Sequence, residues 1–128
     1  MSTVLVIDDE KFVLDIVKVA LTKFGHDVQT ASNGRQGLAK FDKGAFDVVI
    51  TDIRMPGIDG NAVADHIRKS RRQKTPIIAI SATPWMIRDR RKDFNCILYK
   101  PFTLKTLVDA VNDLTHSRKV KGAIAVAV

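Results

Sequence analysis

Acidic, hydroxyl and amine side chains follow the apolar stretches of this 128-residue sequence, each directly where a stretch ends. The stretches are short and rich in β-branched residues, which is typical of strands that are buried on both faces. The side chains that end them are Asp8 and Asp9, Asp52, Ser81 and Lys100. Carboxylates bind hard divalent cations, and a hydroxyl and an ammonium group bind phosphoryl oxygens. Together these residue types point to a metal-dependent phosphoryl site.

Each of these residues also has a purely structural explanation when it is taken alone. An aspartate at a strand end, such as Asp52, often forms a turn or caps a helix. Asp8 and Asp9 before a helix can act as a cap and as favourable charge near the helix N-terminus. The occurrence of all five residues at successive strand ends favours the phosphoryl site over these separate explanations.

The stretches that position these residues alternate between strand and helix patterns. Alternation of this kind predicts right-handed βαβ units and a parallel sheet covered on both faces. Ligands of such sheets bind beyond the carboxyl ends of the strands, so the five residues should converge at one edge. The predicted strands cover 3–8, 27–31, 47–51, 76–81 and 96–99, and the predicted helices cover 10–24, 34–43, 60–70, 84–94 and 103–115.

Local signals define the ends of several helices. Gly25 and Gly44 should end the first two helices, Ser32 or Asn33 should cap the second, and Asp59 should cap the third. The helix over 84–94 should be short or irregular. Apolar residues recur at helical spacing along 10–24, namely Phe12, Val13, Ile16, Val17, Ala20, Leu21 and Phe24.

The expected convergence of acids carries a chemical consequence. Several carboxylates in one crevice repel one another, and Mg²⁺ relieves that repulsion while it also binds substrate phosphate. Lys100 adds a point charge for a phosphoryl oxygen, and Ser81 adds a hydroxyl donor. One of the carboxylates could then act as a nucleophile and form an acyl phosphate.

Four motifs, VLVIDDE, VVITDIRMPGIDG, IIAISA and YKPF, resemble in order and spacing the receiver domain of two-component response regulators. The resemblance covers about residues 3–115. We therefore predict an α/β, flavodoxin-like (β/α)5 fold with a doubly wound five-stranded parallel sheet of strand order 2-1-3-4-5. The domain should span 1–115, and 116–128 should form a basic and apolar tail or linker.

The resemblance also implies a role for each site residue. Asp52 would be the phosphoacceptor, and Asp9, Asp52 and the backbone carbonyl of Arg54 would hold Mg²⁺, with Asp8 assisting. Ser81 matches the hydroxyl of the family's switch. Lys100 matches the lysine that contacts the phosphoryl group, and the peptide bond between Lys100 and Pro101 should be cis.

Two features depart from the family pattern. Ile97 stands where an aromatic switch residue is usual, and Tyr99 is not an obvious replacement for it. The connection over 84–94 is short, and Asn95 could take a left-handed conformation before the fifth strand. Partner choice could therefore differ from the common pattern.

The composition limits the remaining functions. One cysteine, Cys96, excludes an internal disulfide, and neither a signal peptide nor a membrane-spanning run is present, so we expect a cytoplasmic protein. The formal charge of +7 includes basic stretches at 68–74 and 88–92. They lack interleaved aromatic residues, which argues against nucleic acid as a partner of this domain alone.

We predict a phosphorylation-dependent signalling switch rather than an enzyme. The partners would be a sensor histidine kinase or a histidine phosphotransfer protein, and a second copy bound through the face of the fourth helix, fifth strand and fifth helix. The alternative is a receiver-like interaction module that works without phosphorylation. An aspartyl phosphatase is disfavoured because Arg54 stands where a second acid is usual, and a flavin protein because the acids would repel its phosphate.

Overall fold

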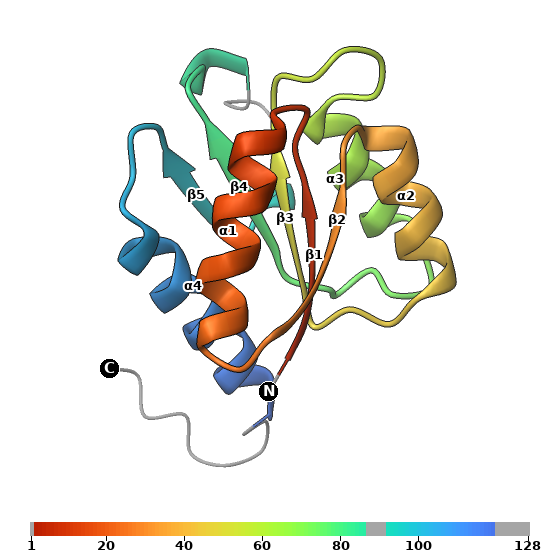
Figure 1. Cartoon of the computed structure of the whole chain (residues 1–128). Coiled ribbons are helices and arrows are strands. Elements are labelled where there is room, and N and C mark those ends of the chain that lie inside the picture. The colour runs from red at the N-terminus through yellow and green to blue at the C-terminus, as the bar shows by residue number, and fades with distance from the viewer. Residues whose placement is uncertain (1, 87–91, 120–128) are drawn as a thin grey trace.

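A computed structural model describes residues 2–86 and 92–119 of the chain. They form a parallel sheet with α-helices on both faces (Figure 1), in the predicted strand order β2-β1-β3-β4-β5. The strands are β1 (Thr3–Ile7), β2 (Asp27–Ala31), β3 (Val48–Asp52), β4 (Ile77–Ser81) and β5 (Cys96–Tyr99). The α-helices are α1 (Lys11–Lys23), α2 (Gly34–Lys43), α3 (Gly60–Arg68) and α4 (Leu104–Lys119).

Side chains of each central strand alternate between two separate cores. Leu5 and Ile7 of β1 pack in the core that α2 and α3 cover, whereas Val4 and Val6 pack in the core that α1 and α4 cover. Every position of β3 and β4 is buried. Burial on both faces explains why these strands are continuously apolar in the sequence.

The predicted helix ends are confirmed at the residues that local chemistry indicated. Asn33 caps α2 by accepting a hydrogen bond from the Gln36 amide. Asp59 caps α3 by accepting one from the Ala62 amide at 2.8 Å. Gly25 follows α1 with a φ of 86°, a backbone conformation that glycine adopts without steric cost.

The buried face of α1 is narrower than its apolar pattern suggested. The buried side chains of this helix are Leu14, Val17 and Leu21, which follow the spacing of one helical face. Two partly buried residues pack beside them, Val13 and Ala20. Phe12 and Phe24 belong to the pattern but are 73% and 63% exposed. Phe24 is the residue that follows the helix, and neither ring belongs to the buried face.

The connection from β4 to β5 differs from the prediction of a helix over 84–94. It begins with a 3₁₀ turn, η1 (Pro84–Met86), and its described part contains no α-helix. Residues 87–91, with most of the basic stretch 88–92, lie outside the described residues. The last helix continues to Lys119, beyond its predicted end at Thr115.

Asn95 does not take the left-handed conformation predicted for it. Among the described residues only glycines have a positive φ. The Asn95 side-chain oxygen instead accepts hydrogen bonds from the Ile77 amide and from Arg68 Nη2, each at 2.8 Å. These bonds satisfy polar groups at the start of β4, so the side chain rather than the backbone of Asn95 shapes this turn.

Candidate functional site

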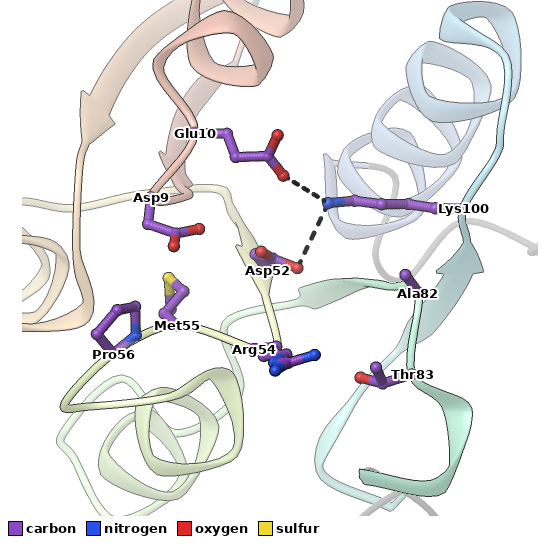
Figure 2. A pocket seen from close by; sticks show the side chains of 9 residues that line it. All are labelled: Asp9, Glu10, Asp52, Arg54, Met55, Pro56, Ala82, Thr83 and Lys100. Carbon is purple, nitrogen blue, oxygen red and sulfur yellow. Dashed lines mark ion pairs between the residues drawn. The ribbon is translucent and has the colours of Figure 1, made fainter.

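A pocket of about 560 Å³ opens at the carboxyl edge of the sheet (Figure 2). Asp9 and Glu10 follow β1, Asp52 ends β3, Thr83 follows β4 and Lys100 follows β5, and all five line the pocket. The sheet order reverses between β1 and β3, because β2 lies on one side of β1 and β3, β4 and β5 lie on the other. Ligands of such sheets bind at the carboxyl ends of the strands beside this reversal, which is where the pocket lies. The predicted convergence is therefore confirmed for Asp9, Asp52 and Lys100, whereas Ser81 does not line the pocket.

Three carboxylates form a cluster at this edge. One oxygen each from Asp8, Asp9 and Asp52 lie within 4.8 Å of one another. Asp9 is exposed, whereas Asp8 is 1% exposed. Asp8 Oδ1 accepts a 2.9 Å hydrogen bond from the Glu10 amide, but Asp8 Oδ2 is buried and has no partner among the described residues. A buried acceptor without a donor indicates that a cation fits here.

Burial opposes ionisation of two of these acids. It raises the pKa of Asp8 to about 7, and the nearby charge of Asp52 acts in the same direction, against the hydrogen bond from Glu10. Burial also raises the pKa of Asp52, which the positive charge of Lys100 partly opposes. The ionised cluster is therefore short of positive charge.

Lys100 supplies one positive charge from the opposite wall of the pocket. Its Nζ lies 3.7 Å from Asp52 Oδ1 and 3.6 Å from Glu10 Oε1 (Figure 2). The Lys100 amide donates to the Ser81 carbonyl at 2.8 Å, and the bond to Pro101 is cis, as the resemblance implied. Glu10 received no role from the sequence, although it stands next to the two aspartates.

Ser81 is buried directly before the pocket residues Ala82 and Thr83, and its hydroxyl oxygen already accepts a hydrogen bond. Ser81 Oγ accepts a 2.9 Å hydrogen bond from the Thr83 amide and lies 3.3 Å from Thr83 Oγ1. Ile97 packs partly buried against the core under α2 and α3, whereas Tyr99 is 39% exposed. The place of the family's aromatic switch residue is thus filled by an aliphatic side chain.

The loop from β3 to α3 carries Arg54, whose side chain lines the pocket (Figure 2). The loop closes tightly: the Gly60 amide donates to the Ile53 carbonyl at 2.8 Å. A Cβ on Gly60 would lie 2.3 Å from the Asp52 carbonyl oxygen. Only glycine allows α3 to start this close to Asp52. The metal-binding role of the Arg54 carbonyl stays a prediction.

The family model for the response regulator receiver domain matches residues 4–112. The chain belongs to this receiver domain family. The match contains β2 to β5, all of β1 except Thr3, and over half of α4, so the receiver fold accounts for the sheet of the described residues. Within the described part of the chain, no helix combines the length and the apolar character that a membrane crossing requires.

Known relatives agree with this assignment. The chain is 35% identical over 115 residues to the transcriptional regulatory protein TrcR of Mycobacterium tuberculosis, covering 87% of this chain and 44% of TrcR. It thus spans less than half of that relative. The response regulator TrrA of Thermotoga maritima, solved in complex with Mg²⁺ and beryllofluoride, superposes with a TM-score of 0.81 at 35% identity, covering 89% of this chain and 99% of TrrA. The receiver domain of Francisella response regulator 1452 superposes with a TM-score of 0.84 at 30% identity, covering 92% and 99%.

Proposed function

We propose that Asp52 accepts a phosphoryl group from a phosphohistidine of a sensor histidine kinase or a histidine phosphotransfer protein. An Asp52 carboxylate oxygen forms the new bond to phosphorus, while the P–N bond of the phosphohistidine breaks and its electron pair stays on the imidazole. The observation that carries the proposal is the place of Asp52: it ends the central strand β3, lies in the acidic cluster, and has the Lys100 ammonium 3.7 Å away.

Lys100 and Ser81 have complementary roles in this proposal. Lys100 offsets the negative charge of the phosphoryl oxygens, since its Nζ lies 3.7 Å from Asp52 Oδ1. Ser81 donates its hydroxyl to a phosphoryl oxygen, which requires that Ser81 moves toward the pocket, because its side chain is buried and does not line it. That movement of the turn after β4 would report phosphorylation to a partner.

We also propose that Asp9, Asp52 and the Arg54 carbonyl bind Mg²⁺, with Asp8 assisting. The clustered oxygens and the unpartnered Asp8 Oδ2 support this assignment, as does the complex of the similar TrrA with Mg²⁺ and beryllofluoride. When bound, Mg²⁺ offsets negative charge on the transferred group. Oxygen ligands in this number suit Mg²⁺, which keeps its remaining positions for water and phosphate.

Intact-protein mass spectrometry tests this function. The chain is incubated with Mg²⁺ and acetyl phosphate or phosphoramidate and then weighed. We expect the wild type to gain one phosphoryl group and the Asp52→Ala variant to gain none. A wild type without mass gain, or a gain that survives Asp52→Ala, would contradict the proposal.

We also propose which reactions the domain carries out and which surface it uses to bind partners. The chemistry is confined to phosphorylation and dephosphorylation at Asp52, so turnover of a small phosphate ester would argue for a phosphatase instead. Self-association would use the face of the β4–β5 connection, β5 and α4. A partner affinity that beryllofluoride does not change would favour the phosphorylation-independent module.

A further inference from the structure

The side chain of Asn61 joins α3 to the turn that follows β4. Asn61 lies in the first turn of α3, and its Nδ2 donates a 2.8 Å hydrogen bond to the carbonyl of Met86 in η1. Its Oδ1 is buried and accepts no hydrogen bond from any residue that the structure describes. A leucine, which has the same branched shape, would place no unpaired acceptor here, so packing alone does not account for an amide at this position.

The start of α3 is fixed to the phosphoacceptor. Gly60, directly before Asn61, donates to the Ile53 carbonyl and leaves no room for a Cβ against the Asp52 carbonyl oxygen. Ile53 in turn donates its amide to Asp52 Oδ1 at 3.0 Å. The backbone of Asn61 therefore keeps its position relative to Asp52.

Met86, the acceptor of the hydrogen bond from Asn61, is connected to Ser81. The Met86 amide donates to the Thr83 carbonyl at 3.0 Å, and the Thr83 amide donates to Ser81 Oγ at 2.9 Å. This series makes the Met86 carbonyl move together with Thr83 and Ser81. The bond from Asn61 to Met86 thus connects the two walls of the pocket, since Asp52 lies in one and Thr83 in the other.

We infer that Asn61 is a positioning residue that holds the turn after β4 in its resting place and opposes the movement of Ser81 and Thr83 toward a phosphoryl group on Asp52. The inference rests on the proposed function. Ser81 does not line the pocket, so it must move toward Asp52 to meet a phosphoryl oxygen. Thr83 and the Met86 carbonyl are joined to Ser81 by the hydrogen bonds above and would move with it. A hydrogen bond present in only one of two states shifts the equilibrium between them by its own free energy. Loss of the Asn61 side chain should therefore favour the phosphoryl-bound state.

Trp85, the single tryptophan of the chain, provides a reporter because it lies in η1 next to Met86 and is 66% exposed. Beryllofluoride is titrated at saturating Mg²⁺ and Trp85 fluorescence gives the dissociation constant. We expect Asn61→Ala and Asn61→Leu to bind beryllofluoride about fivefold more tightly than the wild type, the factor that corresponds to one net hydrogen bond. Asn61→Leu preserves packing if the alanine variant is poorly folded.

Asn112→Ala is the matched control. Asn112 Oδ1 lies 2.8 Å from His26 Nε2, so this variant also loses an asparagine tie between two elements, but in α4 and away from the pocket. It should lose stability and keep the wild-type affinity for beryllofluoride. If the wild type binds beryllofluoride and the Asn61 variants bind it no more tightly, the inference about Asn61 is wrong while the proposed function stands. A wild type that neither responds to beryllofluoride nor gains mass overturns the proposed function as well.

Discussion

At the scale of single residues, the two adjacent aspartates Asp8 and Asp9 differ in environment although they are identical in type. Asp9 is exposed, whereas Asp8 is buried with one oxygen unpartnered. Burial raises the pKa of Asp8 from its ordinary 3.8 to about 7. The folded protein therefore prefers Asp8 protonated over a wide range of pH, and ionised Asp8 is a source of instability that positive charge can relieve.

This raised pKa predicts a pH-dependent effect of Asp8→Asn on stability. Below about pH 4 the carboxyl is neutral in both folded and unfolded chains and contributes little. Between about pH 4 and pH 7 it ionises only in the unfolded chain, so the wild type loses stability as the pH rises, by up to about 4 kcal/mol in total. In metal-free buffer, urea unfolding should show Asp8→Asn gaining over the wild type from pH 5 to pH 8. A stability difference that stays constant with pH would contradict the raised pKa.

At the scale of elements, α3 is fixed at both of its ends, one beside Asp52 and the other at the segments that precede β4 and β5. Its first residue, Gly60, packs on the peptide of Asp52. Its last residue, Arg68, donates hydrogen bonds to the carbonyls of Gln73, Thr75 and Asp93 and to the Asn95 side chain. The helix thereby fixes the loop before β4 and the turn before β5, where the described connection contains no α-helix to do so.

A methyl group at the start of α3 should be poorly tolerated. In Gly60→Ala the Cβ would lie 2.3 Å from the Asp52 carbonyl oxygen and 2.7 Å from Ile53 Cα. We expect a loss of about 3 kcal/mol in the free energy of unfolding, together with a weaker phosphorylation of Asp52. Gly57→Ala is the matched control: its φ is 76° but nothing lies within 4 Å of the new Cβ, so about 1 kcal/mol should be lost. Equal losses in chemical denaturation would contradict the close packing at Gly60.

Arg68→Lys should loosen both segments that α3 holds. A lysine ammonium cannot reach the four acceptors that the planar guanidinium contacts. Loss of these partly buried bonds should lower the free energy of unfolding by about 1–2 kcal/mol and speed amide exchange at Ile77. The neighbouring pair of Lys69 and Asp65 is largely exposed, so Lys69→Ala should cost less than about 0.5 kcal/mol. Similar effects of the two variants would show that Arg68 is only a surface residue.

At the scale of the whole molecule, the acidic edge couples metal binding to folding. The aspartates come from the ends of β1 and β3, which are adjacent strands in the centre of the sheet. Their mutual repulsion opposes the folded state, and a ligand that binds only the folded chain stabilises it by mass action. Mg²⁺ should therefore stabilise the entire domain and not only the pocket.

Thermal unfolding with and without Mg²⁺ measures this coupling. We expect millimolar Mg²⁺ to raise the Tm of the wild type by a few degrees, which corresponds to about 1 kcal/mol for a domain of this size. Addition of a chelator should reverse the shift. In Asp9→Asn the shift should shrink or vanish, because a proposed ligand is lost. A Tm that rises equally in wild type and Asp9→Asn would place the Mg²⁺ effect elsewhere on the chain.

Much of this architecture could be predicted from the order of residues. Alternating apolar strands and amphipathic helices dictate a parallel sheet, and a parallel sheet brings all carboxyl ends to one edge. Asp52 and Lys100 were therefore expected to meet although they lie far apart in the chain. Caps such as Asn33 and Asp59 were also predictable, because their hydrogen bonds involve neighbours only a few residues away.

Other features depend on contacts between distant segments, which no local pattern contains. Tertiary packing buried Asp8 rather than Asp9, exposed Phe12 and Phe24 of an apolar helix, and turned the Asn95 side chain toward Arg68. The sequence by itself determined which side chains gather at the edge of the sheet, since the alternation of strands and helices makes the strands parallel and places all their carboxyl ends together. Only the tertiary structure decided the charge states of these side chains and their hydrogen-bond partners. Desolvation depends on which loops come into contact, and so do hydrogen bonds such as that from Asn61 to Met86.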